Sequence, residues 1–277
     1  MHPVSSLRSH SLWGNEVLAR AQVRRLCSKQ PYFRRSCPPM RRACPMAIAE
    51  PLADPSVEQY NKRMAEKMGW TTLDNPFEYR PERGLYYHYI SEDVIVGSQP
   101  RNAGDIAHLA NENNVRAILN LQQDKDLHHW GVNLHELFCA SSDHGIELIR
   151  TPAVDFDPHS LRATLPTAVA ALERARKNHG RVYVHCTAGL GRSPAVAIAA
   201  LYWFTDMDLD TAYMYLTDIR PCGPNKEAIR GATYDLITGG HWDHFHRLPS
   251  DAFSSLSDDE RDLIREKLLG ESSSESE

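Results

Sequence analysis

The fold expected for this chain follows from residues 182–194, which read VYVHCTAGLGRSP. The first four residues, apart from His185, are β-branched or aromatic, so they favour a buried strand. A loop with two glycines follows the strand, and an alanine-rich helical stretch over 195–201 follows the loop. A strand that passes through a short loop into a helix is the repeating unit of a parallel sheet covered by helices.

Two chemically active side chains, Cys186 and Arg192, stand at the ends of this loop. Loop N–H groups and the positive end of a helix favour the thiolate form of a cysteine. The same N–H groups and the guanidinium suit a doubly charged oxyanion such as a phosphate ester. We therefore expect Cys186 to be a nucleophile, a buried structural cysteine being the alternative. The predicted phosphate-binding residues are Thr187, Ala188, Gly189, Leu190, Gly191 and Arg192.

The first 49 residues differ in composition from the rest of the chain. They contain eight arginines, Lys29, several serines and a single acidic residue, Glu16. This composition is typical of an organelle transit peptide, chloroplast or mitochondrial, and a basic nucleic-acid-binding arm is the alternative. The leader has no long apolar core of the kind that directs secretion, and no stretch of the chain is long enough to span a membrane.

Charge and cysteine content narrow the classes of partner. The whole chain has a formal net charge of −5. The leader, residues 1–49, has a charge of about +8, so the remainder has a charge of about −13. An acidic body argues against binding to nucleic acid or to an anionic membrane. Beyond the leader, the chain has only Cys139, Cys186 and Cys222, whose spacing fits neither a disulfide framework nor a zinc site. We expect no metal and no cofactor.

Strand-like and helix-like patterns alternate after the leader. The predicted strands span 87–96, 117–121, 146–151 and 182–185. The predicted helices span 57–68, 105–113, 134–140, 161–177, 194–204, 209–219, 226–237 and 258–269. This alternation predicts an α/β fold with a central, mainly parallel sheet and helices on both faces. We expect a transit peptide over 1–49, an N-terminal extension over 50–84 that packs on the core, one catalytic domain over 85–245, a docked C-terminal segment over 246–270 and a disordered tail over 271–277.

A proton donor is expected in the loop that follows the strand at 146–151. Residues 153–158 read AVDFDP, and the carboxyl ends of parallel strands gather at one edge of a sheet. Either Asp155 or Asp157 could therefore reach the loop of Cys186. Asp157 stands next to Pro158 and nearer the helix at 161–177, so it fits a helix cap better. Asp155 is the expected general acid.

These residues predict hydrolysis of a phosphate monoester through a phosphocysteine. The Cys186 thiolate attacks phosphorus, while Arg192 and the loop amides hold the phosphate oxygens. Asp155 protonates the leaving oxygen and then activates the water that hydrolyses the intermediate. Ser193 is expected to donate a hydrogen bond that eases departure of the thiolate. We expect His185 to orient the loop rather than transfer protons.

The composition of the loop and nearby aromatic residues bear on the substrate. The loop side chains of Thr187 and Leu190 are neutral, whereas loops that act on phosphoinositides tend to carry lysines for the extra phosphates. Aromatic platforms suit the apolar faces of sugar rings, although each ring taken singly also fits an ordinary core position. The candidate platform residues are Phe77, Tyr79, Trp130 and Phe156.

Several segments together carry a family resemblance. A cysteine followed by five residues and an arginine resembles the signature of the cysteine phosphatases. The loop at 186–192, the segment DFD at 155–157 and the run RPCGPNKEAIR at 220–230 resemble the glucan phosphatases. This group of dual-specificity phosphatases contains laforin and the plant starch-excess enzymes. The resemblance covers roughly residues 55–270 and implies the cysteine-phosphatase fold of the dual-specificity type.

The resemblance implies removal of phosphate from starch during starch breakdown, with preference for the C3 position of glucosyl units. It places the protein in the chloroplast stroma, at the starch granule surface. The resemblance also implies that the phosphatase domain itself binds glucan. We expect no separate carbohydrate-binding module, because only some 35 residues follow the catalytic core.

The resemblance also implies specific glucan contacts. An aromatic channel would map onto Phe77, Tyr79, Trp130 and Phe156, with His129 standing where a further aromatic ring is expected. The remaining implied contacts are Arg150, Arg162, Asn225, Lys226, Phe253 and Glu260.

Two other functions compete with glucan dephosphorylation. One is a dual-specificity phosphatase that acts on phosphorylated Ser, Thr or Tyr of proteins. The other is a starch-binding scaffold without activity, and the presence of Cys186, Arg192 and Asp155 argues against it. No protein partner can be inferred from the sequence.

Overall fold

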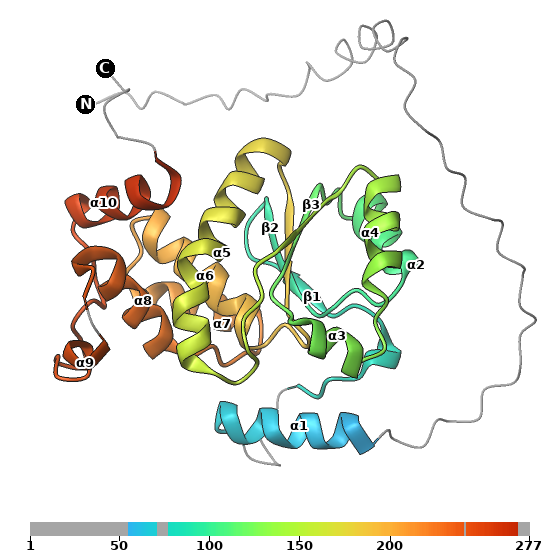
Figure 1. Cartoon of the computed structure of the whole chain (residues 1–277), viewed down its shortest axis with the longest axis horizontal. Helices are drawn as coiled ribbons and strands as arrows, with labels where there is room; N and C mark the ends of the chain where they lie inside the picture. Colours follow the sequence, from blue (N-terminus) through green and yellow to red (C-terminus); the bar gives the residue numbers. More distant parts are fainter. Residues whose placement is uncertain (1–54, 71–76, 241, 271–277) are drawn as a thin grey trace, which may run out of the picture. The chain divides into compact units, whose positions relative to one another are not determined.

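The computed structural model describes residues 55–70, 77–240 and 242–270. The predicted transit peptide and the predicted disordered tail lie outside these ranges. The fold is built around one sheet, which Figure 1 shows between two layers of helices.

The sheet has five strands in the order β1-β2-β5-β3-β4. Their bounds are β1 Tyr87–Tyr89, β2 Val94–Gly97, β3 Ala117–Asn120, β4 Glu147–Arg150 and β5 Val182–His185. The pairs β2–β5, β5–β3 and β3–β4 are parallel, and only β1 runs antiparallel to its neighbour β2. This arrangement confirms the predicted mainly parallel sheet.

The prediction of a single strand over 87–96 was wrong. The chain turns back after β1, where the main-chain N–H groups of Ile90 and Ser91 both donate to the carbonyl oxygen of Val94, at 2.8 and 3.2 Å. The polar run Ser91-Glu92-Asp93 interrupts the apolar pattern and supplies this turn, because short polar side chains favour turns over strands. The result is an antiparallel hairpin of β1 and β2.

Ten helices and one short 3₁₀ helix occur in the part of the chain that the structure describes. Their bounds are α1 Pro55–Met68, η1 Pro81–Arg83, α2 Ala103–Asn111, α3 Asp124–His129, α4 Leu134–Asp143, α5 Pro158–His179, α6 Arg192–Phe204, α7 Leu209–Ile219, α8 Lys226–Thr238, α9 Trp242–Phe245 and α10 Asp258–Leu269. Helices α5 and α6 cover one face of the sheet, while α2 and α4 lie on the other (Figure 1). No helix among the described residues is long and apolar enough to cross a membrane.

Helix α6 is buried on almost every side. It packs against β2, β5, α5, α7 and α10, so its residues from Arg192 to Ala200 are all shielded from solvent. A helix surrounded in this way is apolar around its whole circumference rather than along one stripe. Its alanines allow the close approach of these neighbours.

The central position of β5 determines where the loop of Cys186 lies. Because β5 pairs with both β2 and β3, the loop that follows it emerges in the middle of the carboxyl edge of the sheet. The loops after the two neighbouring strands bind this segment directly: the N–H of Leu121 donates to His185 O, and the N–H of Gln99 donates to Thr187 O, both at 2.9 Å.

Candidate active site

Cys186 lies directly after β5, almost completely buried at 3 % exposure. The hydroxyl of Ser193, in the first turn of α6, donates to its sulfur at 3.4 Å. A hydroxyl in this position stabilises negative charge on the sulfur, because hydrogen bonds to the charged form of a group favour that form.

Gly189 gives the loop its shape. Its φ of +73° lies in the left-handed region, and a Cβ on this residue would lie 2.4 Å from the carbonyl oxygen of Gly97. The guanidinium of Arg220 donates to the carbonyl oxygens of Gly189 and Ala188, at 2.7 and 3.1 Å. Arg220 therefore fixes the loop through two of its carbonyls, a role that its place in the sequence did not indicate.

Arg192 begins α6 and is held by an array of acceptors. Its guanidinium pairs with Asp126 at 2.6 Å and with Asp155 at 3.1 Å. It also donates to Ala153 O at 3.0 Å and to the hydroxyl of Thr187 at 3.2 Å. Burial lowers the pKa of Arg192, but attraction to Asp155, Cys186 and Asp126 outweighs burial and raises it above its ordinary value. The guanidinium is a fixed positive charge at the end of the loop, where α6 begins.

Asp126 is a member of the site that the sequence pattern did not reveal. It lies in α3, a six-residue helix in a segment for which the sequence predicted neither a helix nor a strand. Its carboxylate also accepts the N–H of Gln123, so it caps the helix and binds Arg192 at once. The only local signal for this helix was the capping box that Gln123 forms with Asp126, because a helix this short shows no clear hydrophobic periodicity.

Asp155 has the environment of a general acid. Burial raises its pKa, the positive charge of Arg192 opposes that effect, and the nearby carboxylate of Asp126 adds to it, so the net shift is upward. A raised pKa keeps more of the carboxyl protonated near neutral pH, which is the form that can protonate a leaving group. The next residue, Phe156, has φ +59°, and this tight turn brings the acid to the cavity.

Asp157 and His185 have other roles. The carboxylate of Asp157 accepts the N–H groups of His159 and Ser160, at 2.9 and 3.1 Å, and thereby caps α5. The Nδ1 of His185 donates to the carbonyl oxygen of Cys186 at 3.1 Å. Burial lowers the pKa of His185 to about 4, so the ring is neutral at neutral pH and holds the loop through this bond.

A chain of buried hydrogen bonds links an aromatic residue to the loop. Gln99 donates to the hydroxyl of Tyr79 at 2.6 Å and accepts from the amide of Gln122 at 2.7 Å. The same amide donates to the hydroxyl of Thr187 at 3.2 Å. Because Thr187 also accepts from Arg192, Tyr79 is connected through side chains to the phosphate-binding element.

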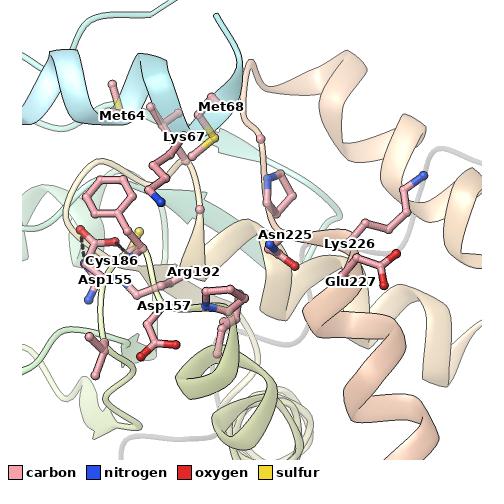
Figure 2. A pocket seen from close by; sticks show the side chains of 18 of the residues that line it. Met64, Lys67, Met68, Asp155, Asp157, Cys186, Arg192, Asn225, Lys226 and Glu227 are labelled. Carbon is pink, nitrogen blue, oxygen red and sulfur yellow. Dashed lines mark hydrogen bonds and ion pairs between the residues drawn. The ribbon is translucent and has the colours of Figure 1, made fainter. Parts of the chain in front are cut away.

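Cys186, Arg192 and Asp155 line one cavity of about 400 Å³, which Figure 2 shows from close by. Asn225 and Lys226, two of the residues predicted to contact glucan, line the same cavity from the start of α8. The side-chain oxygen of Asn225 accepts the N–H of Ala228 at 2.7 Å, and Lys226 pairs with Asp210 at 2.6 Å. Helix α1 forms another wall. No group of three or more metal-ligating side chains occurs among the described residues.

Three of the four predicted platform residues gather around a ring that was not predicted. Tyr79, Trp130 and Phe156 have ring centroids 5.6, 5.2 and 5.8 Å from that of Tyr60, which lies on α1. In the sequence Tyr60 shows only the helical spacing of residues 57–68. Phe77 lies elsewhere: it stacks on Tyr86 at 4.2 Å and lines a second cavity of about 310 Å³.

The four remaining predicted glucan contacts also lie outside the catalytic cavity, and each is engaged in the fold. Arg150 pairs with Asp124 at 2.6 Å, and the buried Arg162 forms two 2.6 Å hydrogen bonds with Asp235. The backbone carbonyl of Phe253 accepts from Tyr202. The side chain of Glu260 completes the capping box of α10 with Ser257. These contacts anchor α5 to α8 and begin α10.

The segment 94–231, which contains Cys186, Arg192 and Asp155, matches the family model described as dual specificity phosphatase, catalytic domain. The chain therefore carries a dual specificity phosphatase catalytic domain. Its fold is that of the α/β cysteine phosphatases, as the resemblance had implied.

Plant relatives of this dual specificity phosphatase carry names that refer to phosphoglucan. The chain is 38% identical over 184 residues to the amyloplastic phosphoglucan phosphatase DSP4 of Castanea sativa, covering 66% of this chain and 48% of that protein. It is 35% identical over 181 residues to the chloroplastic phosphoglucan phosphatase LSF1 of Arabidopsis thaliana, covering 65% and 29%. Laforin of Mus musculus is 27% identical over 160 residues, covering 54% and 48%. The matched segments span about half of these relatives, or less.

Proposed function

We propose that this dual specificity phosphatase removes phosphate monoesters from starch glucan in a plastid, at the granule surface, with preference for the C3 position. The observation that carries the reaction type is the meeting of Cys186, Arg192 and Asp155 in one cavity. The substrate class is supported by the phosphoglucan phosphatases of plants among the relatives, whose names also refer to amyloplast and chloroplast.

The geometry supports a two-step reaction. The sulfur of Cys186, with the Ser193 hydroxyl at 3.4 Å, attacks phosphorus, and the P–O bond to the sugar breaks. Asp155 gives its proton to the leaving sugar oxygen. In the second step the Asp155 carboxylate takes a proton from water, which attacks the phosphocysteine and releases inorganic phosphate and the thiolate. Arg192 stays charged throughout and binds the phosphate oxygens.

The decisive experiment compares three substrates. Phosphate release is measured from solubilised phosphorylated amylopectin, from a phosphotyrosine peptide and from a small aryl phosphate, and the glucosyl position that loses phosphate is identified. We expect release from glucan at rates comparable with the aryl phosphate, and none from Cys186→Ser. Activity on the peptide without activity on glucan would assign the enzyme to protein substrates instead. Release mainly from C6 would contradict the positional preference.

A further inference from the structure

We propose that helix α1, through Tyr60, determines which phosphate esters reach Cys186. Small monoesters enter the cavity with the helix docked, whereas a glucan chain binds only after Tyr60 leaves the aromatic cluster. The inference rests on the proposed function, because it concerns how a polymeric substrate gains access to the same catalytic loop.

Helix α1 is seated on the catalytic face by specific contacts. The side-chain amide of Asn61 donates to the carbonyl oxygen of Tyr79 at 2.9 Å, and its oxygen accepts the N–H of Tyr79 at 2.8 Å. Met64 is only 1 % exposed, and Met68 packs against Gly223, where a Cβ would lie 2.3 Å from the Met68 sulfur. The helix therefore has one defined position.

Tyr60 occupies the centre of the predicted glucan platform. Its ring meets those of Tyr79 and Trp130 at interplanar angles of 66° and 90°, so these contacts are of the edge type. Phe156 contacts two residues of α1: the ring of Tyr60, and the guanidinium of Arg63, which lies 4.6 Å from the Phe156 ring centroid. All three predicted platform rings are thus contacted by the same helix.

This packing leaves two of the three rings almost without an accessible face, and only Phe156 still borders the cavity. Tyr79 and Trp130 are 3 % and 8 % exposed, whereas stacking of a glucosyl unit requires an accessible aromatic face. The remaining cavity of about 400 Å³ is at the small end of the range for small-molecule sites, and Met64, Lys67 and Met68 close one side of it. Figure 2 shows the Lys67 side chain pointing from α1 toward the catalytic loop. A small phosphate ester fits this space, but a glucan chain that extends beyond it meets α1.

The partial burial of α1 suits a helix that can detach from the catalytic face. Tyr60 itself remains partly exposed, and Arg63 and Lys67 are exposed residues, so only part of the helix is buried in the core. An enzyme whose competent form is a fraction of the population binds its substrate more weakly by that fraction. Docking of α1 therefore lowers the apparent affinity for glucan without altering the catalytic residues.

An engineered disulfide between α1 and the loop before α8 tests this inference. A Cβ on Gly223 would lie 3.3 Å from the Cβ of Met68, close to the spacing of half-cystine pairs, and Met68→Cys removes the sulfur that would collide with it. The double variant Met68→Cys/Gly223→Cys is assayed after mild oxidation and again after reduction. Glucan and aryl phosphate are measured in the same samples, and peptide mapping confirms the cross-link.

We expect the oxidised double variant to act on glucan at least about tenfold more slowly than the reduced form, with the aryl-phosphate rate within about twofold. The retained aryl-phosphate activity shows that Cys186 is still a free thiol. Met68→Cys alone, treated with the same oxidant, is the control. Equal glucan rates in the two states would overturn the role of α1. A reduced enzyme with aryl-phosphate activity and no action on glucan would instead refute the proposed function.

A second pair of variants tests release of the helix. Asn61→Ala removes both hydrogen bonds to Tyr79, and we expect the ratio of glucan to aryl-phosphate activity to rise severalfold. Lys62→Ala, at the neighbouring exposed position of α1, should leave the ratio unchanged. A fall in the ratio for Asn61→Ala would mean that α1 is a wall of the glucan site and would refute the inference.

Discussion

Asp126 offers the sharpest test of how the catalytic arginine is held. Its carboxylate lies 2.6 Å from the guanidinium of Arg192, and the two side chains are 12 % and 3 % exposed. Asp126→Asn keeps the shape and one acceptor oxygen but removes the charge. Hydrogen bonds to charged groups contribute about 1.5–3 kcal/mol, and each 1.36 kcal/mol of transition-state stabilisation is a factor of ten in rate. We expect kcat for an aryl phosphate to fall by about 10- to 100-fold.

The same variant should also change the pH dependence. The negative charge of Asp126 contributes to the raised pKa of Asp155, so its removal lowers that pKa. Asp155 acts in its protonated form, and activity is lost as pH rises through its pKa; the basic limb of the profile therefore moves to lower pH. A role in folding alone would leave the limb in place.

Steady-state kinetics between pH 5 and pH 9 measure both effects. The matched control is Asp124→Asn, because Asp124 lies in the same turn of α3 but is 85 % exposed and pairs with Arg150 rather than Arg192. The control should behave as the wild type on an aryl phosphate. A profile for Asp126→Asn that is lower but not displaced would refute the coupling between the two carboxylates, and an unchanged kcat would refute the positioning role.

Three further predictions concern stability and the substrate. Burial lowers the pKa of His185 to about 4 in the folded protein, against an ordinary value near 6.5. Between these two pH values the unfolded chain binds more protons than the folded one. The free energy of unfolding should therefore fall by about 3 kcal/mol as pH drops from 6.5 to 4. Urea unfolding at several pH values should show a shallower fall for His185→Gln, and an identical fall would contradict this assignment. Gly189→Ala should lower kcat sharply because its Cβ meets Gly97, whereas Gly145→Ala, at φ +67° with open space around it, should cost only about 1–2 kcal/mol of stability and leave kcat unchanged. Trp130→Ala should reduce activity on glucan far more than on an aryl phosphate, measured side by side; equal losses would indicate a packing role alone.

The parts of the site carried by one contiguous segment could be predicted from the sequence. Cys186, the loop and Arg192 follow each other within seven residues, and a strand–loop–helix pattern surrounds them. Asp155 could be predicted because the carboxyl ends of parallel strands share an edge, and its neighbour Asp157 could be recognised by its cap position.

Residues that reach the site from distant elements could not be predicted. Tyr60 and Arg220 come from segments far from the loop in sequence. Nothing local distinguishes a tyrosine in a helix pattern from one that lines a cavity, or an arginine after a helix from one that binds the loop. Asp126 was hidden in a helix of only six residues. Arg162 is a similar case. Its charge alone predicts a surface position, yet the fold buries its side chain against Asp235.

The contacts of Arg220 have a consequence for grafting this active site onto another scaffold. Besides the two loop carbonyls, its guanidinium donates to the ring nitrogen of His88 at 3.1 Å and to the carbonyl oxygen of Tyr86 at 3.3 Å. The edge strand β1 is thereby tied to the catalytic loop through one side chain. A transplanted loop of residues 186–192 would need Arg220 and the hairpin residues with it, so the smallest portable unit of this active site is discontinuous in sequence.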